Sequence, residues 1–232
     1  MRKAPIYLLI DTSGSMAGEP ITSVKNGIDM CVKALRTDPA SMEKAFLSII
    51  TFSEKAEVAM KLTYVPDIPI LPDFKANGTT SMGAAIKLLN ESLENDLVEN
   101  TLEEKGDYKA FVVVFTDGRP TDKSVLEAEV KKLNRHKINY FIAATTNEDP
   151  SVKETLKEIT GNEENVIYLP TASPDTFKKF FDWVTQSISK SINRGGAPNG
   201  GEDYGNGSKS EVGGAIGSLP PLPPFTDDGS LL

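Results

Sequence analysis

The sequence is poor in the side chains that many catalytic and disulfide-bonded sites use. Among 232 residues there is one cysteine, one histidine and one tryptophan. The single cysteine, Cys31, excludes an intramolecular disulfide and favours a reducing compartment, so we expect a cytoplasmic protein. The single histidine, His136, follows Ser81 in the chain, whereas a subtilisin-like protease needs its aspartate, histidine and serine in that order. The sequence therefore excludes a disulfide scaffold and a serine protease of this type.

Long apolar runs and an excess of basic residues are missing as well. The apolar run at residues 6–10 is too short for the core of a signal peptide, and no stretch approaches the roughly 20 apolar residues of a membrane span. Lysine and arginine total 25 against 33 aspartates and glutamates, which gives a formal net charge of −8. This charge disfavours nucleic acid and anionic membranes as partners and makes a cation the more natural ligand.

The remaining composition is that of an ordinary globular protein, with 39% hydrophobic and 25% charged residues, and its apolar pattern predicts an α/β fold. Continuous apolar runs typical of strands buried on both faces alternate with segments of helical periodicity. We expect a doubly wound, mostly parallel sheet with helices on both faces and one short antiparallel edge strand. The predicted strands are 6–10, 45–52, 58–62, 109–115, 139–144 and 166–169, and the predicted helices are 21–37, 82–94, 124–136, 150–161 and 174–192.

The composition changes after residue 193. Ten of the 18 glycines lie in residues 194–232, together with a run of leucines and prolines at 219–225. Such a segment buries too little apolar surface to offset the entropy of ordering it. We therefore predict one domain over residues 1–193 and a flexible glycine- and proline-rich tail over residues 194–232. The proline run could bind an aromatic groove as a polyproline helix, but a simple spacer is the favoured interpretation.

Three predicted loops carry small oxygen-bearing side chains. Asp11-Thr-Ser13-Gly-Ser15 follows the first strand, Gly78-Thr-Thr80-Ser81 opens a helix, and Thr116-Asp117-Gly118 follows another strand. Alternate residues of an extended segment point the same way, so Asp11, Ser13 and Ser15 can converge on one ion. The carboxyl ends of parallel strands meet at one edge of a sheet, where ligands bind. Carboxylate and hydroxyl oxygens suit a hard divalent cation, Mg²⁺ above all.

This arrangement resembles the von Willebrand factor type A domain, whose metal-ion-dependent adhesion site has the pattern D-x-S-x-S, then a threonine, then an aspartate. The resemblance covers residues 4 to about 192. It implies that the ligands of Mg²⁺ or Mn²⁺ are Asp11, Ser13, Ser15, Thr80 and Asp117. In this family the threonine usually follows two glycines, and here Thr79 stands where the second glycine is expected. Thr79 is therefore an alternative to Thr80 as the threonine ligand.

The resemblance also implies a function. The two negative charges of the carboxylates balance the charge of a divalent cation, and the three hydroxyls add no charge. An open coordination position on the cation could take an Asp or Glu carboxylate of a protein partner. The segments PIYLLIDTSGSMAGEPI and TSMGAAI are similar to those of short bacterial proteins associated with tellurium resistance and chemical stress, the TerY type. We expect a non-enzymatic, metal-dependent protein-binding module of a cytoplasmic bacterial stress-response complex.

Two alternatives stay open. The first is a type A scaffold that holds no metal and whose oxygen atoms only cap loops. The second is a Mg²⁺-dependent phosphotransfer enzyme, because an aspartate at a strand end is typical of aspartyl-phosphate chemistry. Against the enzyme, the haloacid-dehalogenase pattern needs a second aspartate where Ser13 stands, and the chain has no G-x-x-x-x-G-K-[ST] loop for a nucleotide.

Overall fold

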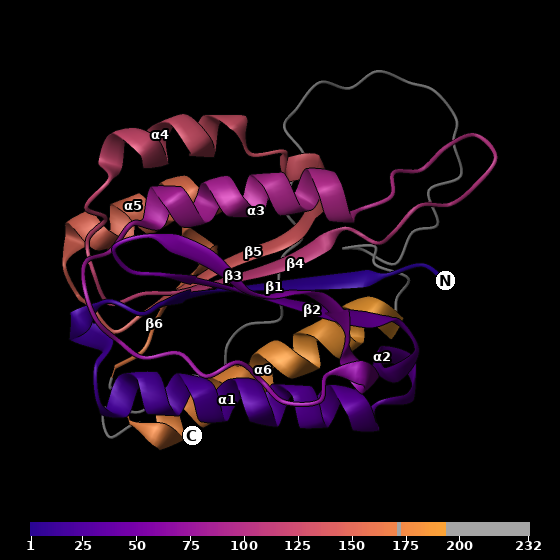
Figure 1. Cartoon of the computed structure of the whole chain (residues 1–232), viewed down its shortest axis with the longest axis horizontal. Helices are drawn as coiled ribbons and strands as arrows, with labels where there is room; N and C mark the ends of the chain where they lie inside the picture. Colours follow the sequence, from indigo (N-terminus) through magenta and orange to yellow (C-terminus); the bar gives the residue numbers. More distant parts are fainter. Residues whose placement is uncertain (171–172, 194–232) are drawn as a thin grey trace.

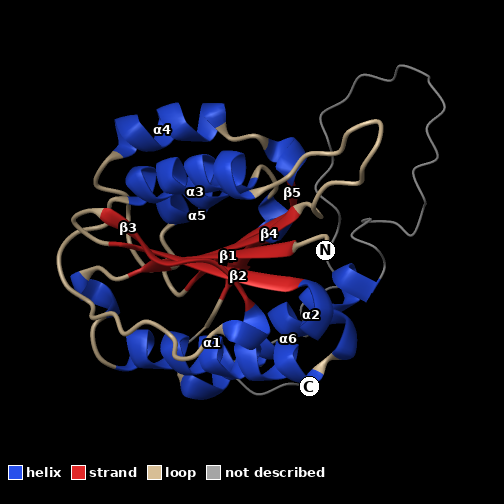
Figure 2. Ribbon diagram, turned by 45° about the vertical axis from the view of Figure 1, so that its right-hand side comes forward, coloured by secondary structure: helices blue, strands red, loops and turns tan. Residues whose placement is uncertain are grey.

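In the computed structural model, which describes residues 1–170 and 173–193, a six-stranded sheet lies between two layers of helices (Figures 1 and 2). The strands are β1 Ala4–Asp11, β2 Ala45–Phe52, β3 Ala56–Tyr64, β4 Ala110–Phe115, β5 Ile138–Thr145 and β6 Val166–Tyr168. The helices are α1 Glu19–Thr37, α2 Pro39–Lys44, α3 Met82–Asp96, α4 Lys123–Lys132, α5 Pro150–Thr160 and α6 Pro174–Asn193. The predicted tail, residues 194–232, lies outside the described residues.

The strand order is β3-β2-β1-β4-β5-β6, and every neighbouring pair is parallel except β2 with β3. This confirms the predicted doubly wound, mostly parallel sheet with one antiparallel edge strand. β1 lies near the middle of the sheet, with β2 on one side and β4 on the other. The chain therefore reverses its direction of winding at β1, which is where open α/β sheets form a crevice at the carboxyl ends of their strands.

The antiparallel edge strand is not short, so that part of the prediction was wrong. β3 has nine residues, and its pairing with β2 runs from Ala56 opposite Phe52 to Tyr64 opposite Phe46. The register shifts on either side of Ile49, and the Ser48 hydroxyl bonds to the carbonyl of Met60 there. Because of this irregularity and the partial exposure of β3, apolar and polar residues do not alternate regularly along the strand. The sequence pattern therefore did not predict its full length.

One additional helix and one helix end differ from the predictions. Asp38 and Pro39 end α1 as expected, but they also begin α2, because the Asp38 carboxylate accepts a hydrogen bond from the Ser41 amide and Pro39 takes the first helical position. The helix predicted to reach residue 136 ends at Lys132, and His136 lies exposed in the short 3-10 helix that follows.

The sheet divides the apolar core into two layers. Along β1, side chains at 6, 8 and 10 pack against α1 and α6, whereas those at 7 and 9 pack against α3 and α5. All eight residues of β1 are buried, as a continuous apolar run predicts. In the described part of the chain, no helix combines the length and hydropathy that crossing a membrane requires.

α6 lies beside α1 on one face of the sheet (Figure 1). An aromatic cluster on α6 packs around Phe115, the last residue of β4. Phe115 has its ring centroid within 4.9–5.7 Å of the rings of Phe177, Phe180 and Phe181. Phe181 also covers Gly27 of α1, where an added Cβ would lie 1.9 Å from a Phe181 ring carbon. The contact between α1 and α6 at this point therefore requires a residue without a side chain at position 27.

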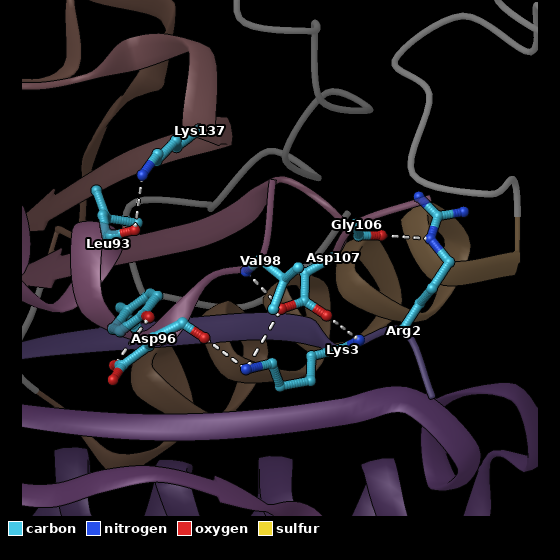
Figure 3. A network of polar contacts seen from close by, with 9 residues as sticks. Arg2, Lys3, Leu93, Asp96, Val98, Gly106, Asp107 and Lys137 are labelled. Carbon is cyan, nitrogen blue, oxygen red and sulfur yellow. Dashed lines mark hydrogen bonds and ion pairs between the residues drawn. The ribbon is translucent and has the colours of Figure 1, made fainter. Parts of the chain in front are cut away.

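A network of polar contacts lies at the amino end of β1, at the edge of the sheet opposite the carboxyl ends of the parallel strands (Figure 3). The Lys3 amide donates to Asp107 Oδ1 at 2.7 Å, and the Lys3 ammonium lies 3.3 Å from Asp107 Oδ2 and donates to the carbonyl of Asp96. Arg2 donates to the carbonyl of Gly106 at 2.6 Å. The long connection between α3 and β4 is thus fixed to the first residues of the chain.

Replacing Gly27 with alanine tests the packing of α6 on α1. We expect Gly27→Ala to lower the stability of the domain by about 1–3 kcal/mol, because the new methyl group overlaps the buried Phe181 ring, which is itself packed against Phe115 and Phe180. Thermal unfolding measures the loss, and Asn26→Ala, at an exposed neighbouring position, is the control. Combining Gly27→Ala with Phe181→Leu should restore part of the stability. A Gly27→Ala protein as stable as the wild type would contradict this packing.

Candidate metal site

The loops after β1 and β4 lie side by side at the carboxyl edge of the sheet. Ile10 pairs with Phe115 across the two parallel strands, so Asp11 and Thr116 are the next residues along each strand. The third predicted loop, which leads into α3, meets the first loop through two backbone hydrogen bonds. The Gly14 amide donates to the Gly78 carbonyl at 3.0 Å, and the Asn77 amide donates to the Thr12 carbonyl at 2.7 Å.

Asp11 is the innermost of the five predicted ligands, with a side chain that is 0% exposed. Its Oδ1 accepts a hydrogen bond from the Ser13 amide at 2.8 Å, and its Oδ2 accepts one from the Thr116 hydroxyl at 2.6 Å. Burial raises the pKa of Asp11 to about 6, the negative charge of Asp117 adds to the rise, and the hydrogen bonds from Ser13 and Thr116 oppose it. The ionised form of Asp11 is therefore less favourable in the folded protein than it is in water.

A chain of hydrogen bonds runs from the interior to the surface through three further predicted ligands. The Ser13 and Ser15 hydroxyl oxygens lie 3.1 Å apart, and the Ser15 hydroxyl donates to Asp117 Oδ1 at 2.7 Å. Ser13 is buried, whereas Ser15 is exposed and Asp117 is partly exposed. The two D-x-S-x-S serines and Asp117 therefore lie in direct contact, with their outer members accessible to another molecule.

Thr80, the fifth predicted ligand, reaches the site beside Gly118. A Cβ added to Gly118 would lie 2.9 Å from the Thr80 hydroxyl oxygen and 3.7 Å from Asp11 Oδ2. Glycine at this position thus leaves open the space into which both oxygen atoms face. Thr80 is 6% exposed, whereas its neighbour Thr79, the alternative ligand, has an exposed side chain. The structure brings Thr80 rather than Thr79 to the other predicted ligands.

The donor set fits a hard divalent cation. Two carboxylates and three hydroxyl groups from three loops lie next to one another at this edge, and such oxygen donors suit Mg²⁺ or Mn²⁺ better than a soft metal. Across residues 1–170 and 173–193, no three side chains of histidine, cysteine, aspartate or glutamate gather as a metal-binding group. A metal bound here would therefore depend on the serine and threonine hydroxyls.

Two polar residues outside the predicted ligand set support this site. Thr116 holds Asp11 Oδ2, and Asn147, in the loop after β5, donates from its side chain to the Asp117 carbonyl at 2.7 Å. Thr116 stands directly before the predicted ligand Asp117 at the end of a buried strand, and that position was a usable signal. Asn147 has no comparable signal, because its contact depends on how the β4 and β5 loops meet in space.

The raised pKa of Asp11 predicts that Asp11→Asn stabilises the metal-free protein at neutral pH. The unfolded carboxyl has a pKa near 3.8 and the folded one near 6, so the loss of stability caused by Asp11 is absent below about pH 4 and complete above about pH 6. We expect a gain on the order of 2 kcal/mol at pH 7.5 and little gain at pH 4. Thermal unfolding without added metal measures it, with Asp29→Asn on the surface of α1 as the control. An equal gain at both pH values would contradict the assignment to Asp11.

Comparison with known proteins identifies the family and the fold. The model of the von Willebrand factor type A domain matches residues 6–183. No curated protein matches the sequence significantly. Similar solved structures include proximal thread matrix protein 1 from the mussel byssus, with 18% identity, a TM-score of 0.61 and coverage of 81% of this chain and 48% of that chain. The pilus adhesin SpaC from Lactobacillus rhamnosus GG, in its open conformation, has 14% identity, a TM-score of 0.65 and coverage of 83% and 30%.

A von Willebrand factor type A protein from Catenulispora acidiphila has 18% identity, a TM-score of 0.55 and coverage of 81% of this chain and 43% of that chain. One structure of the mussel protein, 20% identical with a TM-score of 0.58, has zinc in its MIDAS motif, the metal-ion-dependent adhesion site. The chain spans less than half the length of these neighbours, and at such identities they show the fold alone. Because the family model matches most of its length, the chain belongs to the von Willebrand factor type A domain family.

Proposed function

We propose that this domain is a protein-binding module that depends on a divalent cation, Mg²⁺ or Mn²⁺, held by the five predicted ligands. One observation carries the proposal: oxygen-bearing side chains from three loops converge at the carboxyl edge of the sheet, with a buried inner wall and an accessible rim. Asp11, Ser13 and Thr80 form the inner wall, and Ser15 and Asp117 form the rim. A site built in this way is accessible to a partner from one side only.

The chemistry of the residues supports binding through the cation. Asp11 is fixed in orientation by the Ser13 amide and the Thr116 hydroxyl, so its charge is directed into the site. Neutral hydroxyls provide the other inner contacts, and they add no charge that would weaken attraction to a further anion. The bound cation would supply a coordination position for an Asp or Glu carboxylate of the partner. One neighbour is named a pilus adhesin and another a matrix protein, names that agree with a role in attachment.

We propose that the domain is not an enzyme. In a phosphotransfer mechanism the aspartate at the end of the first strand attacks phosphorus through a free carboxylate oxygen. Here Ser13 stands at the position where the haloacid-dehalogenase pattern needs its second aspartate, so the general acid of that chemistry is missing. His136, the one histidine of the sequence, is an exposed residue of the turn before β5 and is remote from the carboxyl edge of the sheet.

The cellular setting is a further part of the proposal. The similarity of PIYLLIDTSGSMAGEPI and TSMGAAI to TerY-type proteins supports a cytoplasmic bacterial complex that responds to tellurium or chemical stress. The lone thiol, Cys31, is buried on α1, where burial raises its pKa to about 11. Such a thiol packs as a small apolar side chain and is compatible with a reducing compartment.

The metal site is tested by thermal unfolding at increasing Mg²⁺ and Mn²⁺ concentrations. A ligand that binds only the folded protein raises the melting temperature, by an amount that corresponds to about 2.7 kcal/mol at one hundred times its dissociation constant. We expect a saturable rise for the wild type and for Thr79→Val, and little or none for Thr80→Val. The two variants make the same change at adjacent residues, so they separate the ligand from its exposed neighbour. A response lost in Thr79→Val instead would assign the metal to the alternative threonine.

Partner binding is tested by retaining proteins from an extract of the source cells on the immobilised domain, in Mg²⁺ and in chelator. We expect a partner retained only with metal by the wild type and by Thr79→Val, and not by Thr80→Val. If no variant responds to metal, the oxygen cluster caps loops and the metal-free scaffold is correct. If the purified protein hydrolyses acetyl phosphate with Mg²⁺, the enzymatic alternative is correct.

A further inference from the structure

The helix that follows Thr80 has no capping side chain of its own. Ser81 occupies the N-cap position of α3, but it makes no capping hydrogen bond. Its hydroxyl instead donates to the Glu54 carbonyl, at 2.9 Å, in the turn between β2 and β3. The free amides at the start of α3 therefore need an acceptor from elsewhere.

That acceptor is Asp122, almost 40 residues further along the chain. Its Oδ1 accepts from the Gly83 amide and its Oδ2 from the Ala84 amide, both at 2.9 Å. The close approach requires glycine at position 83, because a Cβ there would lie 2.4 Å from the Leu126 amide nitrogen and 2.9 Å from Asp122 Oδ2. Asp122 itself occupies the N-cap position of α4. One carboxylate thus joins the starts of two helices.

The same segment also holds Thr80 by its backbone. The Thr121 amide donates to the Thr80 carbonyl at 2.9 Å. Thr80 is therefore bonded on one side to Thr121, and the helix that begins two residues after it is bonded to Asp122. Since Asp117 lies on the same loop as both, these bonds fix the distance between the threonine loop and the aspartate loop.

The charge of Asp122 matters as well as its geometry. The start of a helix carries a partial positive charge, which repels a cation nearby. The start of α3 lies next to Thr80, and a carboxylate bonded to its amides offsets this charge. An asparagine at position 122 would keep a hydrogen-bond acceptor and lose the negative charge.

We propose that Asp122 is a positioning residue of the metal site: it does not touch the metal, but it sets the place of Thr80 relative to Asp117 by joining the α3 start to the aspartate loop. The inference rests on the proposed metal-binding function. It assigns a role to an aspartate that lies outside the D-x-S-x-S, threonine and aspartate pattern.

The test compares Mn²⁺ affinity, measured by calorimetry on the full chain, with the melting temperature of the metal-free protein. Asp122→Ala should weaken Mn²⁺ binding by roughly 10–100-fold, the range seen when a supporting residue of a metal site is removed. Asp122→Asn should lose less Mn²⁺ affinity than Asp122→Ala, and it is the variant to measure if Asp122→Ala does not fold. The matched control is Asp38→Ala, which removes the carboxylate that caps α2 through the Ser41 amide. It should lower the melting temperature by about 2–4 °C and leave Mn²⁺ affinity unchanged.

Hydrogen exchange of the Gly83 and Ala84 amides provides a second readout, and both should exchange faster in Asp122→Ala without metal. If the wild type binds Mn²⁺ and both Asp122 variants bind it with the same affinity, the inference is wrong but the proposed function stands. Asp122 would then act like Asp38 and only stabilise a helix. A wild-type protein without saturable Mn²⁺ binding would overturn the proposed function, and the role of Asp122 in it as well. A selective loss of Mn²⁺ affinity at Asp122, with the faster exchange, would support the inference.

Discussion

The parallel pairing of β1 with β4 is the constraint on which the site depends. The register that places Ile10 opposite Phe115 also places Asp11 beside Thr116, so the two loops that follow begin next to each other. The loop after β1 leads to α1 on one face of the sheet and the loop after β4 leads to α4 on the other face, an arrangement that forms a crevice between the two loops (Figure 1). The buried apolar side chains of β1 and β4, which pack in both core layers, hold that register.

The two edges of the sheet use charge in opposite ways. At the amino edge, Lys3 and Asp107 are paired with each other, and their charges are neutralised within the chain (Figure 3). At the carboxyl edge, burial raises the pKa of Asp11, and among the described residues no basic side chain forms an ion pair with it. The first arrangement stabilises the fold. The second leaves an unfavourable charge that a bound cation would compensate, which is why stability and metal binding make opposing demands on Asp11.

The sequence predicted best those parts of the structure that depend on residues close together in the chain. Continuous apolar runs predicted the parallel strands, and the order of the three oxygen-rich loops placed Asp11, Ser13, Ser15 and Asp117 at one edge. The six-residue helix α2 and the full length of β3 were not predicted, because a short helix has little periodicity and a partly exposed edge strand has an irregular one. The register of the threonine motif favoured Thr80 over Thr79, and the burial of Thr80 beside Gly118 agrees with that choice. The roles of Asn147 and Asp122 depend on contacts between segments far apart in the chain, which no local pattern encodes.

The three loops of the site belong to different helix layers, and this limits how the site is held together. The first loop leads into α1 in one layer, whereas the other two lead into α3 and α4 in the opposite layer (Figures 1 and 2). Asp122 connects the loop before α4 to the start of α3 through its carboxylate. The loop before α3 is joined to the first loop by backbone hydrogen bonds such as that from the Gly14 amide to the Gly78 carbonyl. A cation with ligands in all three loops would connect the two layers directly across the sheet edge. Its binding energy would therefore stabilise the domain as a whole rather than one loop.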